Sequence, residues 1–335
     1  MRSVVHAGAG DQLAARVPPA PRRRRAGPAG GAGGEGGMTI VVTGASGFLA
    51  GALRRLCAGR GIGWVGVDTA PPAGPGDIAA DICDPSLAGR LPAGADALVH
   101  LAAVSRGPDC RRDLRRAAEI NILGTLNVYE AARRAGIPQL VFASSEWVYG
   151  DSVSADEAAP IDANRMENAY AVTKIAAERL LAAAAAGPGA EGPAVTVLRF
   201  GILYGPRAEN WSAVEALYHD VASRDVVTVG SRATARRFLH VDDAARGIVA
   251  ALGRRERFEV FNLTGAELVT LEAVVRSATA LLGRAVRIVE TDPRNPSVRD
   301  AGNRLARERL GWEPRISLRE GLATLGAAGP GRAHA

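Results

Sequence analysis

A tyrosine and a lysine four residues apart carry the strongest chemical signal in this sequence. Tyr170 and Lys174 lie in the stretch NAYAVTK (168–174), and Lys174 is the only lysine among 41 basic residues. On a helix, residues at i and i+4 share a face. A tyrosine must have its pKa lowered by roughly 3 to act as a base near neutral pH, and a neighbouring ammonium supplies part of that. The spacing therefore predicts a tyrosine base with a lysine partner.

A serine follows from the same reasoning. Ser145 ends the apolar run QLVFASS (139–145), which we expect to be a strand, and it precedes Tyr170 by 25 residues. Ligands collect at the carboxyl ends of strands in open α/β sheets, so its hydroxyl could bind the substrate oxygen that Tyr170 deprotonates. The next residue, Glu146, could act as a general acid or base, or it could pair with an arginine. Both roles of Glu146 stay open.

A glycine-rich stretch supplies a candidate cofactor site. TGASGFLAG (43–51) follows an apolar strand and opens an amphipathic helix. Gly44 and Gly47 fall where the chain must turn tightly and let phosphate approach the backbone, and Ala50 takes the third glycine position, a tolerated variant. The helix N-terminus then offers N–H groups and a positive dipole end to a pyrophosphate.

Two aspartates extend this site. Asp68 closes the second predicted strand, 24 residues after Gly44. A carboxylate there accepts hydrogen bonds from the adenosine ribose and repels a 2′-phosphate, which predicts NAD over NADP. Asp81, where a third strand would end, could contact the adenine edge; a solvated loop aspartate is the alternative for each.

The elements that must position these residues alternate along the chain. We expect strands at 39–42, 63–68, 95–103, 139–145 and 194–200, and helices at 47–60, 113–135 and 168–186. Short apolar strands alternating with helices predict an α/β fold, a Rossmann doubly wound parallel sheet covered on both faces. Beyond about residue 205 the alternation weakens, which predicts a smaller mixed α/β C-terminal substrate lobe.

The domain boundaries follow from this pattern. We expect an NAD-binding domain over 38–205, with part of 236–255 returning to it, and a substrate lobe over 206–325. Residues 1–37 are rich in Gly, Pro, Ala and Arg and predict a disordered extension. We expect the natural product to start at Met38, with 1–37 as an upstream extension. Residues 326–335 predict a second disordered tail.

Composition excludes several classes of function. Residues 1–37 hold six arginines against two acidic residues, so they carry +4 of the net charge of +6, and no basic face for nucleic acid is evident beyond them. The three cysteines, Cys57, Cys83 and Cys110, fit neither a metal site nor a disulfide framework. No apolar run reaches the length of a membrane span. We therefore expect a cytoplasmic protein with no metal, nucleic-acid partner or membrane anchor.

Beyond these residues, the chain resembles an extended short-chain dehydrogenase/reductase over about 38–325. More narrowly, it is similar to the NAD-dependent epimerase/dehydratase family, of which UDP-galactose 4-epimerase is typical. The motifs that carry the resemblance are TGASGFLAG (43–51), VHLAA (99–103), NILGTLNVYEAAR (121–133), SSEWVYG (144–150), YAVTK (170–174), RFGILYGPR (199–207), RRFLHVDD (236–243) and LGWEP (310–314).

The resemblance implies a role for each matching residue. Tyr170 would be the catalytic base and acid, Lys174 its partner and Ser145 the residue that orients the hydroxyl, with Glu146 as a further catalytic candidate. The implied NAD-binding residues are Gly44, Ser46, Gly47, Phe48, Leu49, Asp68, Asp81, Ile82, Leu101, Ala102, Ala103, Asn121, Tyr170 and Lys174. The implied substrate-binding residues are Ser105, Ser145, Glu146, Trp147, Arg236 and Arg294. Asn121 would also support the central helix, and helices 113–135 and 168–186 would form a homodimer interface.

Two departures from the family pattern bear on the reaction. Ile202 stands where the family usually has an asparagine that contacts the substrate, and isoleucine cannot make that hydrogen bond, so the resemblance implies a different seat for the substrate. Trp147 stands where dehydratases and decarboxylases of the family carry an acidic or basic residue. The resemblance therefore favours a nucleotide-sugar 4-epimerase. The alternatives are a nucleotide-sugar dehydratase that uses Glu146, an NAD(H)-dependent oxidoreductase on a non-nucleotide substrate, and a non-catalytic dinucleotide-binding module.

Overall fold

The fold is described from a computed structural model of the chain. It covers residues 37–187, 191–207 and 212–327. The expectations for the N-terminal extension and for the C-terminal tail lie outside these residues, apart from residues 37, 326 and 327. The described residues belong to one compact unit that begins at Gly37.

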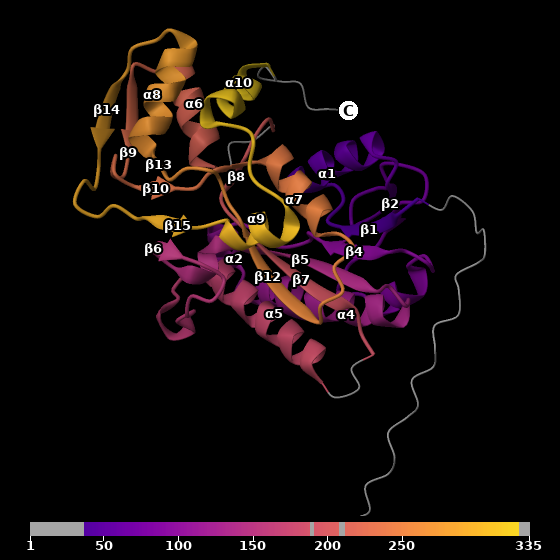
Figure 1. Ribbon diagram of the computed structural model, residues 1–335. Helices are drawn as coiled ribbons and strands as arrows, with labels where there is room; N and C mark the ends of the chain where they lie inside the picture. The colour runs from indigo at the N-terminus through magenta and orange to yellow at the C-terminus, as the bar shows by residue number, and fades with distance from the viewer. Residues whose placement is uncertain (1–36, 188–190, 208–211, 328–335) are drawn as a thin grey trace, which may run out of the picture. The chain divides into compact units, whose positions relative to one another are not determined.

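A parallel sheet of seven strands forms the centre of this unit, in the order β12-β7-β5-β4-β1-β2-β3 (Figure 1). Its strands are β1 (Thr39–Thr43), β2 (Gly63–Asp68), β3 (Ile78–Ala79), β4 (Ala97–His100), β5 (Gln139–Ser145), β7 (Ala194–Phe200) and β12 (Phe258–Leu263). Each neighbouring pair is parallel. The chain runs outward from β1 to β3 and then crosses to β4 on the other side of β1. A parallel sheet whose order reverses in this way leaves a crevice at the carboxyl ends of β1 and β4.

Helices cover both faces of the sheet, which confirms the predicted Rossmann-type fold. In Figure 1, α1 (Phe48–Gly59) and α7 (Val241–Ala251) lie on one face, and α4 (Thr125–Arg134) and α5 (Ala169–Ala186) lie on the other. The first face buries Leu53 and Ile248 against the strands, and the second buries Val128 and Leu181. Because both faces are covered, the strands are nearly continuous apolar runs, as in TIVVT of β1.

The predicted helix over 113–135 is interrupted. The structure has α2 (Gly107–Arg112), α3 (Leu114–Ala118), a π-helical segment (Glu119–Gly124) and then α4. Asn121 lies inside the π-helical segment and is fully buried. Its side chain accepts a hydrogen bond from Val104 N at 2.8 Å and donates to Val104 O at 2.9 Å and to Thr173 Oγ1 at 3.0 Å. These bonds join the segment to the chain after β4 and to α5, and such π-bulges often mark functional sites.

A second group of elements builds the smaller lobe. The strand β9 (Val226–Val229) pairs with β14 (Arg287–Glu290), and the helices are α6 (Ala213–Ser223), α8 (Leu271–Leu282) and α10 (Leu318–Ala327). Three further strand pairs connect it to the sheet region: β8 (Leu203–Tyr204) with β11 (Leu239–His240), β10 (Ala235–Arg236) with β13 (Val269–Thr270), and β6 (Ser152–Ala155) with β15 (Arg299–Ala301). Its own core contains Leu217, Val274 and Leu322.

The chain returns to the central sheet over a longer stretch than expected. We predicted a return within 236–255, which corresponds to α7; the strand β12 and the helix α9 (Arg304–Leu310) also pack there. Trp312, from the motif LGWEP, is 4% exposed and packs in the core between the sheet and the helices α1 and α7. Its Nε1 donates a hydrogen bond to Asp243 O at 3.1 Å. The motif therefore anchors the C-terminal part of the chain to α7.

We expect Trp312→Ala to lower the free energy of unfolding by about 3–5 kcal/mol, because it removes a large buried ring and leaves a cavity beside Gly247 and Leu263. Urea unfolding followed by circular dichroism measures the change. Leu268→Ala, at a side chain that is 40% exposed, is the control and should stay within about 0.5 kcal/mol. A loss below about 1 kcal/mol for Trp312→Ala would contradict this role.

Candidate active site

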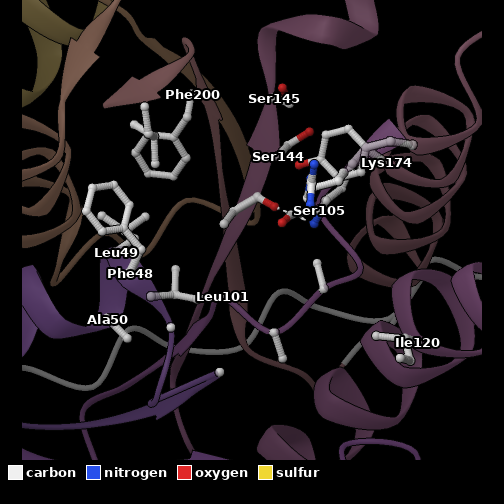
Figure 2. A pocket seen from close by; sticks show the side chains of 18 of the residues that line it. Phe48, Leu49, Ala50, Leu101, Ser105, Ile120, Ser144, Ser145, Lys174 and Phe200 are labelled. Atoms are coloured by element: carbon white, nitrogen blue, oxygen red, sulfur yellow. Dashed lines mark hydrogen bonds between the residues drawn. The ribbon is translucent and has the colours of Figure 1, made fainter. Parts of the chain in front are cut away.

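A cavity of about 1280 Å³ lies at the carboxyl edge of the sheet (Figure 2). This exceeds the roughly 300–1,000 Å³ of a pocket for one small ligand, so there is room for a dinucleotide and a second molecule. Most of the residues that we predicted for the site line it: Gly44, Ser46, Gly47, Phe48, Leu49, Asp68, Asp81, Ile82, Leu101, Ala102, Ala103, Ser105, Ser145, Trp147, Tyr170 and Lys174. Asn121, Glu146, Arg236 and Arg294 are not among the lining residues.

The glycine-rich turn after β1 has the geometry of a phosphate loop. Gly44 has φ +70°, and a Cβ there would lie 2.7 Å from the backbone nitrogen of Ala102, just beyond β4. The Gly44 N–H donates to Val67 O at 2.9 Å, and the Gly47 N–H donates to Gly44 O at 3.0 Å. Gly47 is the N-cap of α1. The turn therefore brings backbone and the N-terminus of α1 to the cavity wall, where a pyrophosphate fits.

Asp68 lies in the cavity at the end of β2, as predicted. Its carboxylate accepts from Ser46 N at 3.0 Å, Ser46 Oγ at 2.7 Å and Ala70 N at 3.0 Å. Burial opposes ionisation, but these hydrogen bonds together lower the pKa of Asp68 below its ordinary value. An ionised carboxylate at this point suits the ribose hydroxyls of NAD and disfavours a 2′-phosphate.

Asp81 also lines the cavity, two residues beyond the end of the short strand β3. A hydrogen bond from the Cys83 N–H, at 2.8 Å, is the main cause that lowers the pKa of Asp81. Arg116 lies 3.4 Å from the same carboxylate and adds to the effect. Asp81 is therefore charged and fixed at the edge of the cavity beside Ile82.

Ser145, Tyr170 and Lys174 meet at the other end of the cavity. Asn168 caps α5 by accepting from the Ala171 N–H at 3.2 Å, which sets where the helix carrying the tyrosine and lysine begins. Lys174 is 2% exposed, its Nζ donates to Ala143 O at 2.8 Å, and it lies 5.8 Å from the centroid of the Tyr170 ring. Figure 2 shows Lys174 beside Ser144, with Phe48, Leu49 and Leu101 on the other side of the pocket.

Burial is the largest influence on the pKa values of Tyr170 and Lys174. Burial raises the pKa of Tyr170 above its ordinary value, and Cys110 raises it further. The hydrogen bond with the Ser145 side chain lowers this pKa, but by less than burial raises it. Burial also lowers the pKa of Lys174 to about 8, against the effect of Glu178. We expected Lys174 to lower the pKa of Tyr170, but the group that lowers it is Ser145, and burial outweighs that effect. At neutral pH the phenol is protonated and the ammonium is charged.

Glu146 makes no ion pair with an arginine among the described residues, and its role as a general acid or base stays a prediction. It is 1% exposed, and among the described residues neither carboxyl oxygen has a hydrogen-bond partner or an ion pair. Burial raises the pKa of Glu146 to about 8, although Arg299, Arg236 and Arg237 oppose this. It lies behind the cavity wall and holds a proton at neutral pH.

The two arginines predicted for the substrate diphosphate are also off the cavity wall. Arg236 is 7% exposed, and its guanidinium donates to Ser297 O at 2.5 Å and to Ser297 Oγ at 2.6 Å. Burial lowers its pKa to about 10. Arg294 is exposed in the loop before β15. Their contact with a substrate stays a prediction.

Several lining residues were not selected from the sequence. Arg207 lies 4.1 Å over the Phe48 ring and pairs with Glu215 at 2.7 Å, and Arg106 and Asn168 also line the cavity. Arg207 belongs to the motif RFGILYGPR. The position of this motif after a predicted strand could have indicated that Arg207 lines the site. Beside the site, Glu178 and Arg199 form a buried ion pair at 2.6 Å. Glu178 follows Lys174 by one helical turn, which could have indicated it.

The described residues contain no helix that could cross a membrane. Within the same part of the chain, no group of three or more His, Cys, Asp or Glu side chains could hold a metal ion.

A dinucleotide crevice with serine, tyrosine and lysine at its far end defines an extended short-chain dehydrogenase/reductase. Within that class, the chain belongs to the NAD dependent epimerase/dehydratase family, whose model matches residues 40–264. It is an enzyme of this family, and its cofactor is NAD.

Known relatives of the chain carry the names of different reactions. The dTDP-glucose 4,6-dehydratase of Streptomyces griseus is 30% identical over 309 residues, which are 85% of this chain and 92% of that protein. The UDP-glucose 4-epimerase of Mycolicibacterium smegmatis is 30% identical over 315 residues, 85% of this chain and 96% of that protein. The structure of MoeE5 in complex with UDP-glucuronic acid and NAD has a TM-score of 0.76 and 30% identity, and covers 86% of this chain and 97% of that one.

We expect Gly44→Ala to weaken NAD binding by at least about tenfold, or ~1.4 kcal/mol. An alanine would be strained at this positive φ, and its Cβ would press on the backbone of Ala102, so the phosphate loop must shift. Calorimetric titration of nucleotide-free protein with NAD measures this. Gly51→Ala is the matched control on α1, where a Cβ would meet only Arg55 Nη1 at 3.9 Å. Equal affinities for the two variants would refute the predicted loop.

Proposed function

We propose that the protein is an NAD-dependent nucleotide-sugar 4-epimerase. The observation that carries the proposal is the distribution of acidic groups around the cavity. Among the described lining residues, Asp68 and Asp81 are the acidic ones, and both lie at the cofactor end. Tyr170 is therefore the proton donor and acceptor beside Ser145. A 4-epimerase needs one such group, because the proton removed from the C4 hydroxyl is later returned to the same oxygen.

Different residues of the chain would bind the cofactor, orient the substrate and stabilise the phenolate. The N-terminus of α1 and the turn at Gly44 would hold the pyrophosphate, and Asp68 would hold the adenosine ribose. Bound NAD⁺ supplies the hydride acceptor for C4, and the positive charge of its ring favours ionisation of the Tyr170 phenol. Ser145 would hydrogen-bond the C4 oxygen and orient it toward Tyr170. Lys174 would stabilise the phenolate by its charge.

The proton then travels back along the same path. Tyr170 takes the proton of the C4 hydroxyl as C4 becomes a ketone. The keto sugar would have to rotate within the cavity of about 1280 Å³ so that its other face is presented for reduction. When C4 is reduced on that face, Tyr170 returns the proton to the new alkoxide. The net reaction inverts C4 and consumes no cofactor.

The position of Glu146 argues against a dehydratase. Loss of water needs a second group that protonates the departing hydroxyl, and Glu146 was the candidate. Its carboxyl is 1% exposed and does not line the cavity, whereas the adjacent Trp147 does. The indole ring cannot exchange a proton in this way.

One observation favours a second candidate, an NAD(H)-dependent oxidoreductase on a non-nucleotide substrate. Ile202 lines the cavity and presents an apolar side chain where the family usually has a hydrogen-bonding asparagine. A substrate without a diphosphate would suit that wall. This candidate consumes added cofactor stoichiometrically, and the epimerase does not.

We also propose a homodimer in the cytoplasm. Exposed apolar side chains on the helices predicted for the interface support the dimer: Leu114 (62% exposed), Leu123 (59%), Val172 (43%) and Leu180 (40%). All three cysteines of the chain are free, which suits a reducing compartment.

We expect the enzyme to convert at least one nucleotide hexose to its C4 epimer. Incubation with a panel of UDP-, dTDP- and GDP-sugars, followed by mass spectrometry and NMR, would find a product of unchanged mass with C4 inverted. Tyr170→Phe should lose at least about 100-fold in kcat, or ~2.7 kcal/mol, because the described lining residues include no other phenol and no carboxyl beside Ser145. A product lighter by one water would indicate the dehydratase. Full turnover by Tyr170→Phe would contradict the mechanism.

Lys174→Arg should fold but lose most activity, by about 100-fold in kcat. The guanidinium keeps the charge, but its planar shape does not fit the buried position where Nζ bonds Ala143 O at 2.8 Å. Steady-state kinetics measures the loss, and the melting temperature checks that the variant is folded. Near-normal turnover would show that any cation suffices at this position.

A further inference from the structure

A buried carboxylate lies one helical turn beyond Lys174 on α5. Glu178 is 3% exposed, and both of its oxygens have partners. Oε1 accepts from Ser144 Oγ at 2.5 Å and from Arg199 Nε at 3.1 Å, and Oε2 accepts from Arg199 Nη2 at 2.6 Å. Ser144 and Arg199 are register partners on β5 and β7. The carboxylate therefore binds two neighbouring strands at once.

These bonds join the helix that carries Tyr170 to the strand that carries Ser145. Glu178 bonds Ser144, and Lys174 bonds the carbonyl of Ala143, the residue before it. Two contacts one turn apart on α5 thus hold two consecutive residues of β5. Tyr170 lies one further turn back along the same helix, facing Ser145.

The other groups around Lys174 are neutral. Tyr170 on α5 and Cys110 on α2 both have a raised pKa, mainly because of burial. His100 on β4 is buried, which lowers its pKa to about 3. Burial lowers the pKa of Lys174, and Glu178 opposes this more than Cys110 does. Arg199, on β7, is the charged partner of Glu178.

We propose that Glu178 is a positioning residue of the active site, which holds α5 against β5 and supplies the negative charge that keeps the Lys174 ammonium in place. The inference rests on the roles of Tyr170 and Lys174 in the proposed function. It assigns Glu178 no contact with substrate or cofactor. A residue that only stabilises the fold would not alter the ionisation of Lys174, so the two roles can be separated.

The single lysine makes the test direct. Protein labelled with [ε-¹³C]lysine gives one side-chain signal, and its chemical shift against pH reports the pKa of Lys174 in the NAD-saturated enzyme. Glu178→Gln should lower that pKa by about one or more. The alkaline limb of the kcat profile should move to lower pH by a similar amount, because less of the enzyme keeps the charged ammonium at a given pH.

A second variant guards against misfolding. Glu178→Gln leaves Arg199 buried without its ion-pair partner, which can unfold a protein, whereas replacing both partners is usually tolerated. The double variant Glu178→Gln with Arg199→Met removes both charges and should still show a lowered Lys174 pKa.

Glu259→Gln is the matched control. Glu259 on β12 is 8% exposed and binds Arg254 with two bonds of 2.8 and 2.5 Å. It resembles Glu178 in burial and pairing, but it lies on the edge strand of the sheet. The pKa of Lys174 should not change in this variant, although stability falls.

An unchanged Lys174 pKa in folded Glu178→Gln and in the double variant would overturn the inference. The titration of Lys174 needs no substrate, so it tests the role of Glu178 whether or not epimerisation is found. If no nucleotide sugar is epimerised, the proposed function fails by itself. If epimerisation is found and Lys174 titrates normally in both variants, Glu178 has a structural role alone.

Discussion

The reversal of strand order between β1 and β4 is the constraint on which the site depends. In a parallel sheet all strands end at the same edge, and the connections on the two sides of the reversal leave in opposite directions. The turn after β1 can then lie against the chain after β4, and Gly44 is close enough to Ala102 that a Cβ would lie 2.7 Å from its backbone nitrogen. The same edge carries Asp68 at the end of β2 and Ser145 at the end of β5, so one groove reaches from the phosphate loop to the reacting group.

Much of this arrangement could be predicted, because the bounds of its strands and helices depend on residues that are neighbours in the sequence. β2, β5 and β7 match their predicted ranges, and α5 begins one residue after the predicted start, beyond its asparagine cap. The stretch 113–135 could not be predicted as it is, because the interruption depends on bonds from Asn121 to Val104 and Thr173, which are distant in sequence. An apolar period of 3.6 residues does not distinguish an α-helix from one that contains a single π-helical segment.

The charged residues show the limit of sequence reasoning more clearly. Asp68 was placed correctly because its position follows from the end of a strand. Glu146 follows Ser145 directly, yet its carboxyl lies behind the cavity wall, because the short helix Glu146–Tyr149 turns the chain there and puts Trp147 on the wall. The surroundings of Arg236 depend on Ser297, 61 residues later. Which arginine contacts which group depends on loops of the smaller lobe, which carry little periodicity.

Burial explains why the chain uses lysine once. Removal from water lowers the pKa of Lys174 to about 8, so its charge responds to neighbouring groups. An arginine in the same place would stay charged at any physiological pH, and its wide planar head would need several hydrogen-bond acceptors. Elsewhere in the described chain, arginines pair with carboxylates, as Arg199 does with Glu178, and there a permanent charge and a planar fork are an advantage. Beside a buried phenol, a compact ammonium and a planar guanidinium are not equivalent. Lysine is found at that position.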